Sequence, residues 1–239
     1  MMQSLAEQTV AQLGGPHSVL ARQKRDHIEL DRLIESADTA TGNDRAEYLT
    51  RLCRLVFPHA FAEESVLWPA IRRWVPEGEQ LTLEIEREHQ EINELFAELE
   101  KLDVDSPEHR QLWHRIVALL REDVRDEEDR LLPMLQQRMS PRALVALGWV
   151  WEATRRTSPT RPHPVVARRP PGNVAAAAPL TVLDRARDRL DRMSRGSAGQ
   201  LGGVSTSLSA ALARVGGMIE RVPPLTRGED PSTHSGRTR

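Results

Sequence analysis

Residues 123–133 read Asp-Val-Arg-Asp-Glu-Glu-Asp-Arg-Leu-Leu-Pro, and residues 59–69 read His-Ala-Phe-Ala-Glu-Glu-Ser-Val-Leu-Trp-Pro. Placed one over the other, both stretches give a residue able to bind a metal, three others, a Glu-Glu pair, two others, a leucine, a large apolar residue and a proline. The two stretches lie 64 positions apart. An internal repeat of this kind sets the architecture, because each copy is one structural unit.

A second pair of similar stretches lies upstream of the first. Residues 25–30 read Arg-Asp-His-Ile-Glu-Leu, and residues 87–92, 62 positions later, read Arg-Glu-His-Gln-Glu-Ile. Each copy therefore holds a histidine, His27 or His89, followed 32 or 34 positions later by a His-or-Asp-x-x-x-Glu pair. We interpret the first 140 residues as one helical hairpin written twice.

Apolar residues recur at spacings of three and four over four segments, roughly 18–38, 44–72, 79–102 and 107–138, as they do along one face of a helix. Turns rich in glycine, proline, asparagine or aspartate separate these segments. A fifth helix, 140–156, starts at a Ser-Pro cap. The pattern predicts an all-α fold, an antiparallel up-down four-helix bundle with a short fifth helix.

Ionisable residues interrupt each of the four apolar stripes near its middle. They are His27, His59, Glu63, His89, Asp123 and Glu127. A single unpaired carboxylate in a protein core costs several kcal/mol, whereas a metal ion compensates such a cluster. Residues i and i+4 share one helical face, so that a His-x-x-x-Glu pair can hold one ion or bridge two. These six residues are the predicted metal ligands; a buried hydrogen-bond network without metal is the alternative.

Several other polar residues are expected to lie outside the site. Glu64 and Glu128 are either exposed charges, the favoured interpretation, or additional carboxylate ligands. The remaining histidines are expected outside the site: His114 at the surface or at an interhelical edge, and His17, His109, His163 and His234 at the surface.

Charge divides the chain into two unequal parts. Residues 1–156 hold 20 basic and 29 acidic residues, a net charge of −9, whereas residues 157–239 carry 13 basic and 6 acidic residues, a net charge of +7. Prolines and glycines interrupt the second part. We therefore expect a bundle domain over 14–156 and a basic, largely disordered tail over 157–239, with a possible short amphipathic helix at 181–194. Removing such a tail should change neither metal content nor stability.

Composition also limits the compartment and the partners. Cys53 is the single cysteine, which suits a reducing compartment. The sequence shows no signal peptide and no run of about 18 apolar residues, so a cytoplasmic protein without stable membrane insertion is expected. Walker loops, dinucleotide fingerprints and serine-nucleophile elbows are absent from the sequence, which argues against nucleotide and hydrolase chemistry. No nucleic-acid partner is expected.

The ordered set of histidines and carboxylates over residues 14–140 resembles the hemerythrin-like (HHE cation-binding) domain. The resemblance rests on His27, His59, Glu63, His89 and Glu127, with the Glu-Glu-x-x-Leu-x-Pro sequences around them. It implies a non-haem centre of two iron ions bridged by carboxylates and an oxo or hydroxo group. It also implies a small-molecule ligand: dioxygen, peroxide or nitric oxide.

The sequence departs from the family pattern at Asp123, where the family has a fourth histidine. Three imidazoles and three carboxylates give a harder, more anionic ligand set than the four imidazoles and two carboxylates of the family pattern. Such a set favours the ferric state and lowers the reduction potential. This argues against reversible oxygen carriage and is compatible with oxygen or peroxide chemistry.

Three functions follow from these patterns. The first is a di-iron protein that binds, senses or scavenges dioxygen or related small oxidants. The second is a di-iron enzyme with peroxidase or catalase-like activity. The third is a structural or regulatory bundle, stabilised by its metal, whose basic tail binds a partner.

Overall fold

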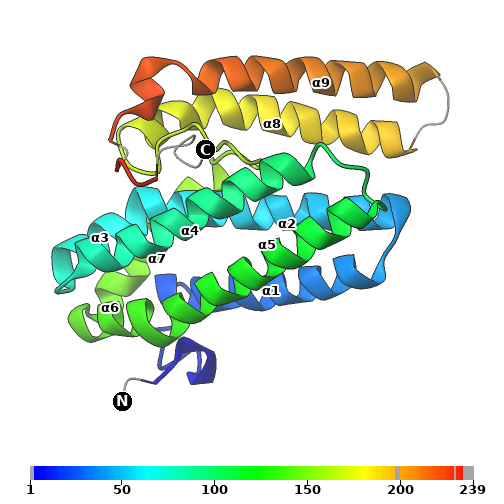
Figure 1. The fold of residues 1–239 in the computed structure, drawn as a ribbon. Helices are drawn as coiled ribbons and strands as arrows, with labels where there is room; N and C mark the ends of the chain where they lie inside the picture. The colour runs from blue at the N-terminus through cyan, green and yellow to red at the C-terminus, as the bar shows by residue number, and fades with distance from the viewer. Residues whose placement is uncertain (1–2, 197–199, 229, 234–239) are drawn as a thin grey trace.

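Four antiparallel helical segments form the bundle that the repeat predicts (Figure 1). The structure, a computed structural model, describes residues 3–196, 200–228 and 230–233, and every regular element in these ranges is helical. The segments are α1 (Val19–Thr39), α2 with α3 (Gly42–Ala62 and Trp68–Trp74), α4 (Gly78–Leu99), and α5 with α6 (Pro107–Asp126 and Leu132–Arg138). The predicted all-α bundle is confirmed.

Local sequence sets where these helices begin. The hydroxyl groups of Ser18 and Ser106 accept hydrogen bonds from the backbone N–H groups of Ala21 and His109, which caps α1 and α5. The turn before α4 requires Gly78, because a Cβ atom there would lie 2.6 Å from the carbonyl oxygen of Ile71. The helical hairpin from α3 to α4 is therefore closely packed at its turn.

A π-helical turn interrupts the second and the fourth segment at the repeated Glu-Glu pair. The turns are Glu63–Leu67 (η2) and Glu127–Leu131 (η3). In each copy a proline, Pro69 or Pro133, follows within the first two residues of the next helix. Proline has no N–H group to donate to the carbonyl four residues earlier, so the wider turn forms where an ordinary α-helical bond is missing anyway.

Two apolar clusters fill the bundle, one on each side of the level where these turns lie. The helix α1 passes from one cluster at Leu20 to the other at Leu30, and α4 does so between Ile85 and Ile92. The second and fourth segments cross between the same clusters at their π turns. The ionisable residues therefore lie between two apolar layers, where water does not compensate their charges.

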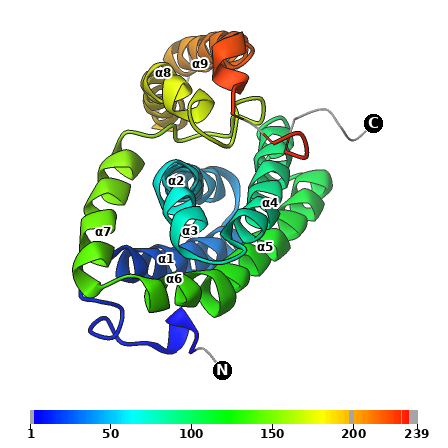
Figure 2. The same ribbon diagram turned by 90° about the vertical axis from the view of Figure 1, so that its left-hand side faces the viewer.

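The fifth helix, α7 (Pro141–Arg156), packs against α1, α2 and the first π turn (Figure 2). It begins at the expected cap, since the Ser140 hydroxyl accepts a hydrogen bond from the N–H of Ala143. Its closest approach to the start of α1 is at Gly148, where a Cβ atom would meet the carbonyl oxygen of His17 at 2.2 Å. The helix α7 thus covers the edge of the bundle beside α1 and α2.

The C-terminal part of the chain differs from the expected disordered tail. The helices α8 (Gly172–Gly196) and α9 (Gln200–Glu220) form an antiparallel pair that lies over the bundle, with α8 in contact with α2 (Figure 1). The expected amphipathic helix 181–194 is a part of α8. Residues 197–199, 229 and 234–239, His234 among them, lie outside the described residues.

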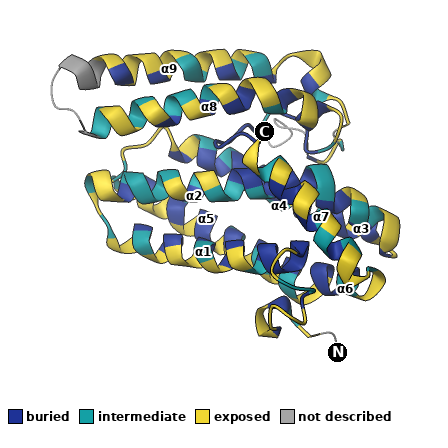
Figure 3. Ribbon diagram, turned by 180° about the vertical axis from the view of Figure 1, so that it is seen from behind, coloured by how far each residue is buried: buried dark blue, intermediate teal, exposed yellow. Residues whose placement is uncertain are grey.

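Both charged and apolar side chains hold this helical pair. The inner face of α8 buries Ala176 and Leu180 and, one and two turns later, Asp184 and Asp188 (Figure 3). This face did not look like a buried face in the sequence, because half of it is charged. Arg161 contacts Asp188, and Asp184 accepts the N–H groups of residues 160 and 161.

The charge asymmetry of the sequence is neutralised within the chain. Basic residues of the C-terminal part pair with acidic residues of the bundle. The pairs are Arg169 with Glu79 and Glu86, Arg161 and Arg187 with Glu100, and Arg195 with Glu47. The bundle of the same chain thus supplies an acidic partner for the basic segment. None of the helices searched among the described residues has the length and apolarity that crossing a membrane requires.

Candidate metal centre

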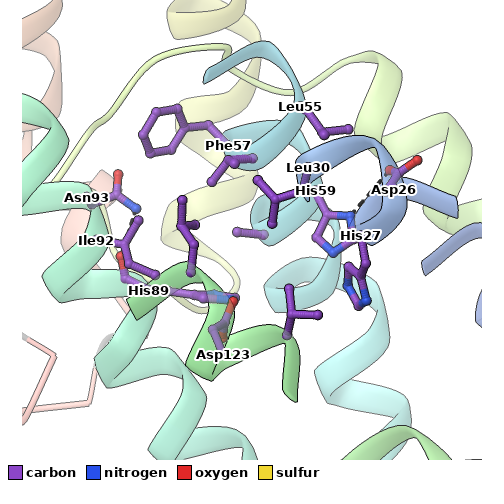
Figure 4. Close-up of a pocket in the computed structure, with 14 residues that line it drawn as sticks. Asp26, His27, Leu30, Leu55, Phe57, His59, His89, Ile92, Asn93 and Asp123 are labelled. Carbon is purple, nitrogen blue, oxygen red and sulfur yellow. Dashed lines mark hydrogen bonds and ion pairs between the residues drawn. The ribbon is translucent and has the colours of Figure 1, made fainter. Parts of the chain in front are cut away.

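The six predicted ligands come together at one level between the two apolar clusters. His59 Nε2 lies 3.0 Å from Glu63 Oε1, and His27 Nε2 lies 3.2 Å from Glu127 Oε2. His89 Nε2 lies 3.7 Å from the second Glu63 oxygen and 3.5 Å from Asp123 Oδ1. Figure 4 shows His27 and His59 on one side of a pocket, with His89 and Asp123 on the other.

Within this cluster, two sets of three residues are spaced as metal ligands. One set is His27, His59 and Glu127, and the other is Glu63, His89 and Glu127; within each set the ligand atoms lie within 4.8 Å of one another. Glu127 belongs to both sets, so its carboxylate stands between the two positions as a bridging ligand would. Asp123 belongs to neither set, and its Oδ1 lies 3.5 Å from His89 Nε2.

The donor atoms of the cluster lack the partners that a metal would supply. His27 Nε2, both carboxylate oxygens of Glu63, Asp123 Oδ1 and Glu127 Oε1 are buried and make no hydrogen bond of good geometry; the contacts of 3.0–3.7 Å within the cluster are ion pairs. Each buried unsatisfied polar group costs about 1–3 kcal/mol. A hydrogen-bond network alone would leave these atoms with poor geometry, whereas imidazole and carboxylate donors facing one point suit a divalent or trivalent cation.

Each of the three histidines donates its other ring nitrogen to a carboxylate. His27 Nδ1 donates to Glu128 Oε1 at 2.8 Å, and His89 Nδ1 donates to Glu64 Oε1 at 3.1 Å. His59 Nδ1 lies 3.3 Å from Asp26 Oδ2. In the neutral form that binds metal, these contacts fix the tautomer and turn every Nε2 toward the cluster, as outer partners of metal-bound histidines do.

Glu64 and Glu128 therefore differ from both interpretations of the sequence. Glu64 is 1% exposed and Glu128 is half-buried, so neither is a freely solvated charge. Neither belongs to the two ligand sets, because each contacts the Nδ1 side of a histidine. In each π turn the first glutamate faces the cluster and the second orients a histidine. Asp26, missed in the sequence, has the same role; its only signal was its place next to His27.

Burial and close charges change the acidity of the cluster. Burial lowers the pKa of His27, but its contacts with Glu127 and Glu128 outweigh this and raise it to about 9. Burial and the charges of Glu63 and Asp123 raise the pKa of Glu127 to about 8. The pKa values of His59 and His89 are also raised, because carboxylates outweigh their burial. Without metal, the cluster thus holds protons at neutral pH.

A cavity of about 30 Å³ opens between the histidines and the apolar cluster that contains Leu30 and Ile92. Its polar wall includes His59, His89 and Asp123, and its apolar wall includes Phe57 and Ile92 (Figure 4). One water-sized molecule needs roughly 10–15 Å³ of such volume. The cavity therefore accommodates a molecule of two or three heavy atoms beside the candidate ligands.

The histidines outside the site divide into exposed and buried ones. His17 and His114 are exposed, as expected. His109 and His163 are buried, contrary to the expectation from the sequence. His109 faces the bundle from the first turn of α5. His163 lies between Asp184 and Glu220, and although burial lowers its pKa, these carboxylates raise it to about 9.

Comparison with known proteins agrees with this geometry. Residues 18–135 match the model of the hemerythrin HHE cation-binding domain. An uncharacterized hemerythrin-like protein of Schizosaccharomyces pombe is 21% identical over 174 residues, 70% of this chain and 84% of that protein. A DNA nickase of Nostoc is 28% identical over 118 residues, which are 49% of this chain and only 33% of the nickase. Among solved structures, none matches the chain significantly. Together with the helical bundle and its cluster of histidines and carboxylates, these matches identify residues 18–135 as a hemerythrin HHE cation-binding domain.

Proposed function

We propose that the centre binds two iron ions and, beside them, a small oxidant: dioxygen, peroxide or nitric oxide. The observation that carries the proposal is the pair of ligand sets that share Glu127 next to a small cavity. Two sets with a shared carboxylate suit two ions more naturally than one. Imidazole and carboxylate together suit iron, which accepts both nitrogen and oxygen donors.

The size of the cavity supports a small ligand. A volume of about 30 Å³ admits a diatomic or triatomic molecule and peroxide, but excludes an organic substrate of ordinary size. Small-molecule sites for organic ligands are roughly tenfold larger. The substrate class proposed for this centre is therefore restricted to small oxidants.

Asp123 supports reaction with the oxidant over reversible carriage. Its carboxylate lines the cavity and lies 3.5 Å from His89 Nε2, at the place of the family's fourth histidine. One more negative charge stabilises the oxidised state of a bound metal relative to the reduced state. We expect a centre that senses or scavenges oxidants.

Metal analysis of ligand variants tests the proposal. The full-length protein should contain two iron ions per chain after aerobic purification. Glu127→Ala should lower occupancy at both positions, whereas His27→Ala and His89→Ala should each lower it at one. His114→Ala, on the same helical segment as Glu127 but exposed, is the matched control and should keep both ions. A parent protein that binds no iron, or a Glu127→Ala variant that keeps two ions, would contradict the proposal.

A second experiment separates a sensor or binding protein from an enzyme. The aerobic protein is mixed with hydrogen peroxide, and oxygen evolution and oxidation of a one-electron donor are followed. Turnover that disappears in Glu127→Ala assigns catalase-like or peroxidase activity. Spectral change without turnover assigns binding or sensing. Nicking is not proposed for this chain, because the match to the Nostoc nickase covers a third of that protein.

A further inference from the structure

Residues 163–173 of the C-terminal segment reach the His89 side of the centre in three ways. The N–H of His163 donates to Asn93 Oδ1, and Asn93 Nδ2 donates to the carbonyl oxygen of His89. Asn173 Nδ2 donates to Ser65 Oγ, inside the first π turn. The third contact is made by Arg168. This segment lies outside the matched residues 18–135.

Arg168 is buried and held at a fixed place. Its side chain donates from Nη2 to the carbonyl oxygens of His163 and Val166, at 2.8 and 2.9 Å. Nη1 lies 3.7 Å from Glu64 Oε1, the same oxygen that accepts the Nδ1–H of His89. Arg168 and Glu64 are 6% and 1% exposed, so water screens this ion pair weakly. The contacts form a line from Arg168 through Glu64 to His89.

A parallel line reaches the other side of the centre from α7. Arg155 Nη1 lies 3.6 Å from Asp26 Oδ2, and Asp26 contacts His59 Nδ1. Arg155 also lies beyond residue 135. Arg155 and Arg168, which both follow the matched residues 18–135, thus contact the carboxylates that orient His59 and His89. The half-buried Glu128 has no corresponding arginine contact among the described residues.

We propose that Arg168 is a positioning residue for the metal centre, which holds Glu64 against His89 and so couples docking of the C-terminal segment to metal binding. The proposal rests on the proposed metal-binding function. Outer partners of metal-bound histidines fix ring orientation, and their loss typically costs 10–100-fold in affinity. Arg168 acts one contact further out, so the expected loss is at the lower end of that range. This loss of affinity should affect only one of the two metal positions, the one that includes His89.

Cobalt binding to the full-length protein tests the proposal, with visible absorption as the readout. The parent should bind two Co²⁺ ions, and Arg168→Gln should weaken one of the two about tenfold. Arg169→Gln is the matched control: it removes the same charge from the adjacent residue, which pairs with Glu79 and Glu86 and not with Glu64. This control should bind both ions as the parent does. Arg168→Lys, which keeps the charge, should restore part of the affinity.

A double-mutant cycle with Glu64→Gln separates this role from general stability. If Arg168 acts through Glu64, the two substitutions together should lower the metal affinity of the affected position no more than Glu64→Gln alone. The effects of substitutions at two residues in contact with each other are not additive. Additive effects, or equal losses in Arg168→Gln and Arg169→Gln, would overturn the proposal and leave the proposed function intact. A parent protein that binds no Co²⁺ would overturn both.

Discussion

Asp26 Oδ2 lies 3.3 Å from His59 Nδ1, and in the second copy of the repeat its counterpart Glu88 has no imidazole to contact. The residue equivalent to His59 is Asp123. Glu88 Oε2 is accordingly buried without a hydrogen-bond partner, and burial together with the charge of Asp123 raises the pKa of Glu88 to about 7. The sequence difference between the copies thus alters two residues, the candidate ligand and its outer partner.

Asp123→His should therefore restore both the fourth histidine beside the metal and the contact between that histidine and its outer partner Glu88. The new imidazole gains Glu88 as an outer partner. Metal affinity at the position that includes His89 should therefore rise about tenfold. The loss of one negative charge should raise the midpoint potential of the iron, which a redox titration measures. Asp123→Asn is the control, because it removes the charge without adding an imidazole. If both variants bind metal equally, Glu88 does not orient the new histidine.

Metal affinity should increase with pH. The pKa values of His27 and Glu127 are raised to about 9 and 8 in the metal-free protein, so a metal that binds at pH 7 must displace their protons. Affinity should climb from about pH 6 and level off above about pH 9. Calorimetry in two buffers of different ionisation enthalpy should show the release of protons. Binding at pH 7 without proton release would contradict this expectation.

The stability of the metal-free protein should follow the opposite trend. His27 and Glu127 both have folded-state pKa values above their unfolded values, so folding favours their protonated forms. This contribution is complete below the unfolded pKa values and is lost as pH rises through about 8 to 9. The unfolding temperature of the metal-free protein should fall from pH 6.5 to pH 9. The metal-loaded protein, measured by the same thermal scan, should show a smaller fall.

His163→Gln should loosen the C-terminal segment. The substitution leaves Asp184 and Glu220 buried without the cation between them, and breaking one member of such a group costs about 3–5 kcal/mol. The unfolding temperature should drop by roughly 10 °C. Because the folded pKa of His163 is about 9, its stabilising contribution is present below about pH 6.5 and is lost as pH rises through 9. The exposed His17→Gln should leave the unfolding temperature unchanged.

Removal of residues 157–239 should now be harmful, contrary to the expectation from composition. The truncated bundle loses the contacts of Arg168 and His163 and leaves Glu64 without its arginine partner. It should unfold at lower temperature and hold less metal than the full chain, as thermal scans and metal analysis would show. Unchanged stability and metal content would mean that the bundle is independent of this segment.

Ala60→Val should hinder the small ligand without disturbing the metal. Ala60 lines the cavity beside His59, and two added methyl groups fill much of a volume of about 30 Å³. The rate of nitric oxide or azide binding, followed by stopped-flow absorption, should fall about tenfold or more, while the iron content stays at the parental value. Ala118→Val, at an exposed position of α5, is the matched control. An unchanged rate would place the ligand elsewhere.

The spacing of apolar residues predicted the bundle, because a helix in a bundle buries one apolar face. Ionisable residues on that face are unusual, so they indicated the residues at the centre of the bundle. His89 between Ile85 and Ile92 is such an exception. The roles of Glu64 and Glu128 could not be read in this way. An ideal α-helix turns Glu64 about 100° away from Glu63, and only the π turn, which periodicity does not reveal, explains why both are turned inward.

The docking of the C-terminal helices on the bundle, beyond the expected helix 181–194, could not be predicted for a different reason. Buried helical faces are usually apolar, but α8 buries Asp184 and Asp188, whose partners His163 and Arg161 lie more than twenty residues earlier. Pairing across such a separation leaves no periodic signal. The opposite net charges of the two parts are the available clue, but in the sequence they fit a solvated basic tail at least as well as a segment that binds a partner.

The π turns have a consequence for how this protein tolerates insertions and deletions. A helix that loses one residue rotates everything beyond the deletion by about 100°. A π turn already holds one residue more than an α-helix would, so deletion of Ser65 would turn the first π turn into an α-helical one and leave Trp68 on its buried side. The same single-codon event would remove the hydroxyl that accepts the Asn173 amide and would change the directions in which Glu63 and Glu64 point. A one-residue deletion at either π turn should therefore keep the helix beyond it in register and act on the metal centre instead.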